Sequence, residues 1–185
     1  LHYASSVEIA GYLLDQGAEI DARDVDHEST AAQYMVRARQ KIARFLISRG
    51  CRTDLLMAAA LGDLDLARKH LADDPDSIRL RVSDEHFPMI GGRTGGTIYQ
   101  WELGWYVSAH QVARAFGHED VLQLLMQHSP DEIKLIVACW LKHEAAAQRL
   151  IAADTGLAER LPASERRQLA HAARNNDLAA LRLMN

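Results

Sequence analysis

A repeated segment is the feature of this sequence that most restricts its fold. Residues 13–18 (LLDQGA) return as residues 46–51 (LISRGC), which places Gly17 and Gly50 33 residues apart. Self-similarity at a period of about 20–50 residues is typical of solenoids, in which each unit buries its apolar face only against its neighbours. The sequence therefore predicts a stack of similar units.

Apolar residues recur at helical spacing before both glycines. They are Val7, Ile9, Ala10, Leu13 and Leu14 in the first unit, and Ile42, Ala43, Phe45 and Leu46 in the second. A glycine just past the last apolar position can take the left-handed conformation that ends a helix. We therefore predict one helix that ends at Gly17 and another that ends at Gly50, the latter preceded by a short antiparallel helix over residues 30–36.

Helix pairs are also expected along the rest of the chain, with less regular connections. The expected pairs are 55–61 with 64–71, 108–113 with 117–125, 130–141 with 144–153, and 163–174 with 177–184. Since no linker rich in proline, glycine and serine divides the chain, we expect one solenoid over residues 1–185, built from about six helix pairs.

Three segments carry a family resemblance. Residues 19–27 (EIDARDVDH) resemble a passage from a helix end into a projecting β-hairpin, and residues 1–4 (LHYA) and 108–113 (SAHQVA) resemble a motif that opens a first helix. The chain is thus similar to the ankyrin-repeat family, with degenerate repeats. The resemblance implies an all-α solenoid with β-hairpin fingers. Because residue 1 falls inside a motif, we also expect a fragment that begins within a repeat.

The motif departs from the family pattern at two kinds of position. Residues 30–33 (TAAQ) are the corresponding motif of the second unit. Gln33 there and Gln111 in residues 108–113 stand where the family has a histidine that ties neighbouring repeats by hydrogen bonds, and alanine replaces the proline in both motifs. Glutamine can donate and accept hydrogen bonds, so we expect the tie to survive.

The resemblance also implies a function. Ankyrin stacks are recognition modules that bind partner proteins on the concave side, formed by fingers and first helices, and they need no cofactor. We accordingly expect a protein-protein interaction scaffold. In the first finger we assign Asp24, Asp26 and His27 to partner binding.

A long connection precedes the unit that begins at Ser108. The alternation of Tyr99, Trp101 and Leu103 with polar or aliphatic neighbours predicts a two-sided strand. We therefore predict an enlarged β-hairpin finger over about 83–105, with the glycine-rich residues 91–96 at its tip.

This insert, residues 83–107, is rich in aromatic side chains. Tryptophan and tyrosine dominate binding hot spots. We expect the following insert residues to contact the partner: Tyr99, Trp101, Glu102, Trp105 and Tyr106. The alternative is that these aromatic side chains fill a small core of the insert itself.

Two other classes of function stay open. In the first, His86, His110, Asp84 and Glu102 line a small-molecule or enzymatic pocket walled by tryptophans. No metalloprotease motif, Cys-x-x-Cys pair or Gly-x-Ser-x-Gly elbow supports it, and we predict neither a catalytic residue nor a metal site. In the second, the chain is an architectural domain of a larger polypeptide.

Composition restricts the partners further. A formal net charge of -4 gives no basic excess to neutralise phosphates, so we do not expect nucleic acid as a partner. No run approaches the roughly 18 apolar residues that a membrane span requires. Cys51 and Cys139 form neither a disulfide framework nor a metal finger. No basic-then-apolar leader opens the sequence, and we expect a cytoplasmic location.

Overall fold

The computed structural model describes residues 1–91 and 95–184. The helices of the N-terminal half are α1 (Val7–Asp15), α2 (Ala31–Tyr34), α3 (Gln40–Ser48), α4 (Leu55–Leu61), α5 (Leu64–Asp73), the 3-10 helix η1 (Pro75–Arg79) and α6 (Ile98–Glu102). Those that follow are α7 (Ala109–Phe116), α8 (Glu119–His128), α9 (Asp131–Trp140), α10 (Glu144–Ala153), α11 (Ala163–Arg166), α12 (Gln168–Arg174) and α13 (Leu178–Met184).

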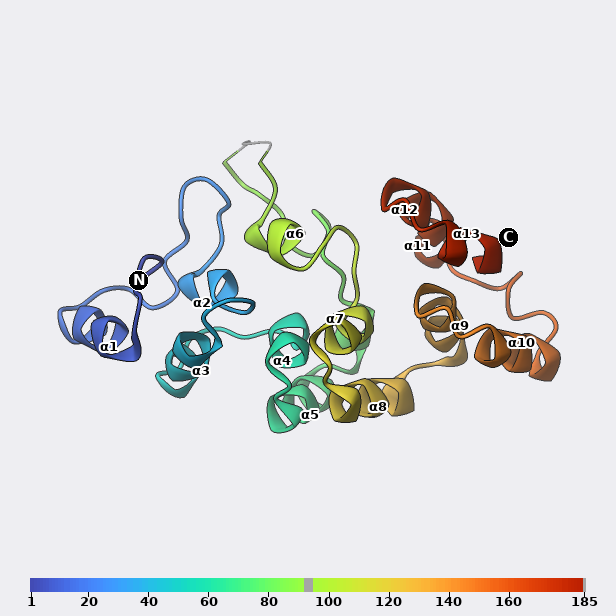
Figure 1. Cartoon of the computed structure of the whole chain (residues 1–185), viewed down its shortest axis with the longest axis horizontal. Helices are drawn as coiled ribbons and strands as arrows, with labels where there is room; N and C mark the ends of the chain where they lie inside the picture. The colour runs from blue at the N-terminus through green and yellow to red at the C-terminus, as the bar shows by residue number, and fades with distance from the viewer. Residues whose placement is uncertain (92–94, 185) are drawn as a thin grey trace.

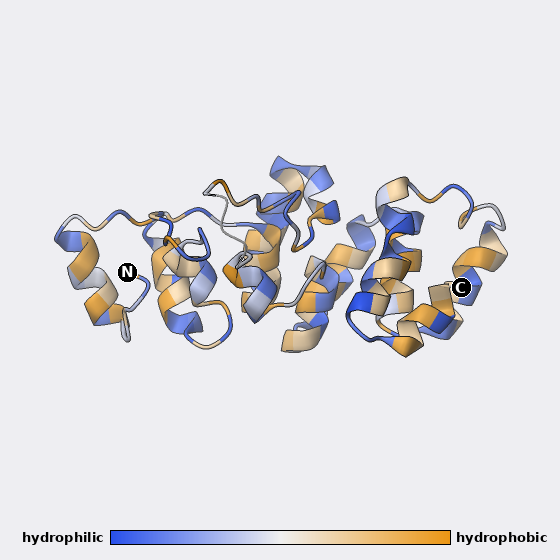
Figure 2. Ribbon diagram, turned by 90° about the horizontal axis from the view of Figure 1, so that it is seen from above, coloured by the Kyte–Doolittle hydropathy of each residue, from blue (hydrophilic) through white to orange (hydrophobic). Residues whose placement is uncertain are grey.

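Most of these helices form antiparallel pairs that stand side by side in a row (Figure 1). Within the pairs, α2 packs on α3, α4 on α5, α7 on α8 and α9 on α10. Between neighbouring pairs, α4 packs against α7 and α5 against α8. Apolar residues are accordingly spread along the whole row and are not gathered at one centre (Figure 2).

Local sequence explains where the helices begin and end. Thr30 and Ser108 each close a capping box with a glutamine three residues later, in which the Gln33 and Gln111 side chains accept the cap backbone N–H at 2.9 and 3.0 Å. Gly17 takes a left-handed conformation directly after the C-cap of α1, as the pattern of apolar residues predicts.

The all-α class agrees with the sequence-based prediction, but the predicted β-hairpin fingers are wrong. No strand is present in residues 1–91 and 95–184; near the first finger (residues 23–30) only one isolated antiparallel bridge forms, between Arg23 and Thr30. The first finger is closed instead by Asp24, whose carboxylate accepts the backbone N–H groups of Asp26, His27 and Ser29. Such a side-chain turn replaces the ladder of backbone bonds that a hairpin requires.

The strand predicted in the insert is also wrong, because residues 98–102 form helix α6. Ile98 and Tyr99 are adjacent in sequence and both buried, whereas a strand would place them on opposite faces. The predicted hairpin tip includes residues 92–94, which lie outside the described residues.

The C-terminal helices depart from the row. Helices α11, α12 and α13 lie over α9, on the side of the row where α6 also lies (Figure 1). Both α11 and α13 contact α9, and Trp140 of α9 packs in one small core with Ala172 and Ala180. This placement brings α12 toward the insert. In the described part of the chain, no helix has the length and apolar character needed to cross a membrane.

Candidate functional site

A cavity of about 700 Å³ lies where the insert faces α12. Its lining residues come from three places: the start of the insert, the segment that includes α6, and the end of α12. They are Asp84, Pro88, Met89, Gly95, Gly96, Gln100, Trp101, Trp105 and Arg174. We call this space the insert cavity.

The first finger holds the insert in place. The Glu28 carboxylate accepts the backbone N–H of Ile90 at 2.6 Å, and the Ser29 hydroxyl accepts that of Ile98 at 3.0 Å. His27 Nδ1 lies 2.8 Å from the carbonyl oxygen of Gly96. Segments nearly seventy residues apart in sequence are thus joined by hydrogen bonds that fix the backbone on one side of the cavity.

The predicted binding residues of the first finger have mainly structural contacts. Besides the three backbone donors, Asp24 accepts the hydroxyl of Tyr34 at 2.8 Å. Burial raises the pKa of Asp24, but hydrogen bonds from Ser29, His27, Tyr34 and Asp26 together hold it below its usual value. Asp26 lies within the turn that Asp24 closes, and its side chain is exposed.

Trp101 is the exposed aromatic side chain at the cavity. It is 69% exposed, yet its indole N–H donates to the carbonyl oxygen of Gly95 at 2.7 Å. Its ring also meets the His27 ring edge-on, with 6.1 Å between centroids. A large apolar surface is therefore held in one orientation while facing solvent.

Tyr99 lies on the opposite, buried side of α6. It is 1% exposed, and its hydroxyl donates to Asp54 at 3.0 Å. Phe87 meets its ring edge-on at 5.3 Å. The alternative role of the insert aromatics, filling a core, therefore describes Tyr99, whereas Trp101 faces outward.

The other predicted aromatic residues contact α12. The Arg174 guanidinium lies 4.0 Å from the centroid of the Trp105 ring, and Asn175, just after α12, donates to the Trp105 carbonyl at 3.2 Å. Tyr106 stacks on His171 with 3.5 Å between centroids and 14° between planes. Of these residues, Trp105 and Arg174 line the insert cavity.

Glu102 faces away from these contacts. Arg37 donates to its backbone carbonyl at 2.7 Å and lies 3.5 Å from its carboxylate. The carboxylate is thus paired with a cation of the second unit, outside the insert cavity.

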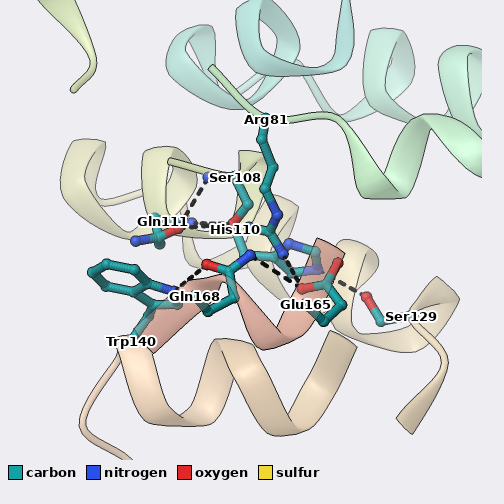
Figure 3. Close-up of polar contacts among 8 residues, drawn as sticks. All are labelled: Arg81, Ser108, His110, Gln111, Ser129, Trp140, Glu165 and Gln168. Carbon is teal, nitrogen blue, oxygen red and sulfur yellow. Dashed lines mark hydrogen bonds and ion pairs between the residues drawn. The ribbon is translucent and has the colours of Figure 1, made fainter. Parts of the chain in front are cut away.

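A buried polar cluster lies around Arg81 and Glu165 (Figure 3). Arg81 and Glu165 form an ion pair at 3.0 Å, and each side chain is only 3% exposed. Gln168 donates to the same carboxylate at 3.2 Å and accepts the indole N–H of Trp140 at 2.9 Å. The cluster therefore joins the segment just before the insert to α9, α11 and α12.

His110 belongs to this buried region and not to the cavity. Ser129 Oγ donates to the carbonyl of Leu125 at 2.8 Å, so the 2.8 Å contact between Ser129 Oγ and His110 Nε2 requires the proton on Nε2. Burial, together with the positive charge of Arg81, lowers the pKa of His110 to about 3. The imidazole is thus neutral and enclosed at physiological pH.

The residues of the alternative enzymatic pocket do not converge. His86 Nδ1 lies 3.0 Å from Ser83 Oγ, and burial lowers its pKa. Asp84 alone of the four lines the cavity, where Gln100 donates to it at 3.1 Å. Within the described ranges, no group of three or more histidine, cysteine, aspartate or glutamate residues is placed to hold a metal ion.

Sequence reasoning missed Arg174, Arg81, Glu165 and Gln168. Arg81 and Glu165 are 84 residues apart, and neither lies in a motif that signals a partner. Only the position of Arg81 just before the insert could have drawn attention to it.

No protein-family model matches the sequence, and the search of curated proteins found no significant match.

Proposed function

We propose that this chain is a protein-binding scaffold of the ankyrin type, which holds a segment of a partner protein in the insert cavity. The observation that carries the proposal is Trp101, a 69% exposed side chain fixed by a hydrogen bond at the rim of that cavity. Tryptophan supplies a large contact area, and fixing it beforehand lowers the entropy lost on binding.

The insert and the first finger each carry a further exposed apolar side chain. Ile90 of the insert and Val25 of the first finger are both exposed. The two segments are linked through Glu28 and His27, so their exposed side chains belong to one connected structure. A cavity of about 700 Å³ within such a structure has the size of a site for a small ligand or a few peptide side chains.

The repeated helix pairs support the resemblance on which the class of function rests. Capping boxes recur at Thr30 and Ser108, each of which begins a segment whose glutamine stands where the ankyrin first-helix motif has a histidine. Curved stacks of this kind present extended surfaces that suit partner segments better than small metabolites.

Selection from a random peptide library tests the proposal. Peptides that bind the immobilised chain would be measured by calorimetry against the unaltered chain, Trp101→Ala and Tyr12→Ala. Tyr12 is a matched control because it is 64% exposed but lies on α1, away from the cavity.

We expect Trp101→Ala to weaken binding at least tenfold, since truncating a hot-spot residue costs about 2 kcal/mol or more. Tyr12→Ala should leave the affinity unchanged. If no peptide is selected, or if both variants bind as tightly as the unaltered chain, the proposal is wrong.

A further inference from the structure

Helix α12 and the residue just before it carry three basic side chains, of which Arg174 lines the insert cavity. Arg167, His171 and Arg174 are spaced four and three residues apart, which places them on one face of a helix. Two of them contact the insert directly, since His171 stacks on Tyr106 and Arg174 lies over Trp105.

The charge of this face is not neutralised locally. Among the described residues, no carboxylate lies within ion-pair distance of Arg167 or Arg174, whereas the buried Arg81 is paired with Glu165. Stacking on Trp105 occupies one face of the Arg174 guanidinium and leaves its N–H edges for an acceptor. Such an edge fits a carboxylate through two parallel hydrogen bonds.

The titration of His171 agrees with an excess of positive charge. Burial lowers its pKa most, and the charges of Arg174, Arg81 and Arg167 lower it further. A group facing this helix therefore experiences a field that favours a negative charge.

We infer that Arg174 binds the carboxylate of an acidic residue in the partner segment, next to the apolar contact at Trp101. This inference rests on the proposed function and specifies the partner as an acidic segment with an apolar or aromatic residue nearby. The insert side of the cavity bears Asp84, and Glu85 follows it, which disfavours a polyphosphate chain. A single carboxylate carries less negative charge than a polyphosphate and is repelled less by these two acidic residues.

Matched peptide libraries test this inference. Three libraries share the same random apolar and aromatic positions but carry glutamate, glutamine or lysine at the same fixed positions. Enrichment on the immobilised chain is compared for the unaltered protein, Arg174→Gln, Arg174→Lys and Arg149→Gln. Arg149 is the control because it is an exposed arginine of α10 that does not line the cavity.

The glutamate library should be enriched about tenfold over the glutamine library, as expected for one charge-assisted hydrogen-bonded pair. Arg174→Gln should abolish that preference, Arg174→Lys should retain part of it, and Arg149→Gln should keep it. Equal enrichment of the three libraries, or preference for lysine, would overturn the inference.

The two proposals fail in different ways. If Trp101→Ala weakens peptide binding while Arg174→Gln does not change the preference for glutamate, the cavity binds peptides but the carboxylate assignment is wrong. If Trp101→Ala binds peptides as tightly as the unaltered chain, the proposed function itself is wrong. Binding of a single-stranded oligonucleotide or of anionic lipid vesicles as tightly as the glutamate peptides, and dependent on Arg174, would overturn the assignment to a peptide.

Discussion

Replacing His110 by leucine should remove most of the acid sensitivity that this imidazole gives to the folded chain. His110 is fully buried, and its pKa of about 3 lies far below the ordinary value of 6.5. Between these values the unfolded chain binds a proton that the folded chain excludes, so stability falls as the pH falls below 6.5. The slope for one such group is about 1.4 kcal/mol per pH unit.

The magnitude follows from that slope. At about pH 5, the imidazole should have lowered the free energy of unfolding by about 2 kcal/mol relative to neutral pH. The leucine variant has no such group, so its loss should be smaller by this amount. Near pH 7.5 the variant should differ from the unaltered chain by only about 1 kcal/mol, because Ser129 keeps its bond to the Leu125 carbonyl.

Urea unfolding followed by far-ultraviolet circular dichroism at a series of pH values measures this difference. Ser129→Ala is the matched control, since it removes the hydrogen-bond partner of Nε2 but keeps the titrating imidazole. It should lower stability by a similar amount at every pH. Equal pH dependence in His110→Leu and the unaltered chain would refute the reasoning.

Two further predictions concern the interior. Arg81→Met leaves Glu165 buried without its cation and should lower the free energy of unfolding by about 3–5 kcal/mol, measured by urea unfolding. Adding Glu165→Leu should recover most of this loss. If the losses of the two single variants simply add in the double variant, the two residues do not act as a pair. The other prediction compares two glycines, Gly62 and Gly117, which both have left-handed backbone, with φ of 65° and 78°. A Cβ at Gly62 would lie 2.4 Å from the His118 ring, whereas a Cβ at Gly117 would meet nothing within 4 Å. Gly117→Ala should therefore cost about 1–2 kcal/mol, and Gly62→Ala at least about 1 kcal/mol more; equal losses in thermal unfolding would argue against the clash.

Much of the helical architecture could be predicted because its signals are local. Apolar spacing and a following glycine located α3, and the pairs 55–61 with 64–71 and 130–141 with 144–153 agree closely with the observed helices. Each of these boundaries depends on residues within a few positions of one another.

The fingers could not be predicted correctly, because side chains there replace backbone pairing. Asp24 satisfies three backbone donors, which makes a strand ladder unnecessary. In the insert, an alternating pattern of five residues is too short to distinguish a strand from the single turn of α6, whose form depends on the burial of Tyr99 against distant residues.

The candidate site was predicted only on the insert side. The aromatic composition pointed to Trp101 and Trp105, both of which line the cavity. The α12 side depends on how the C-terminal helices pack over α9, which is fixed by the contact of Arg81 with Glu165 and of Trp140 with Gln168. No local pattern encodes contacts between residues so far apart in the chain.

Hydrogen exchange with and without a selected peptide tests most directly whether a partner segment lies in the insert cavity. The backbone amides of residues 95–105 and of the end of α12 should exchange more slowly when the peptide is bound, because both sides of the cavity are then covered. Slower exchange confined to α9 and α10, with residues 95–105 unchanged, would show that the partner binds elsewhere on the stack.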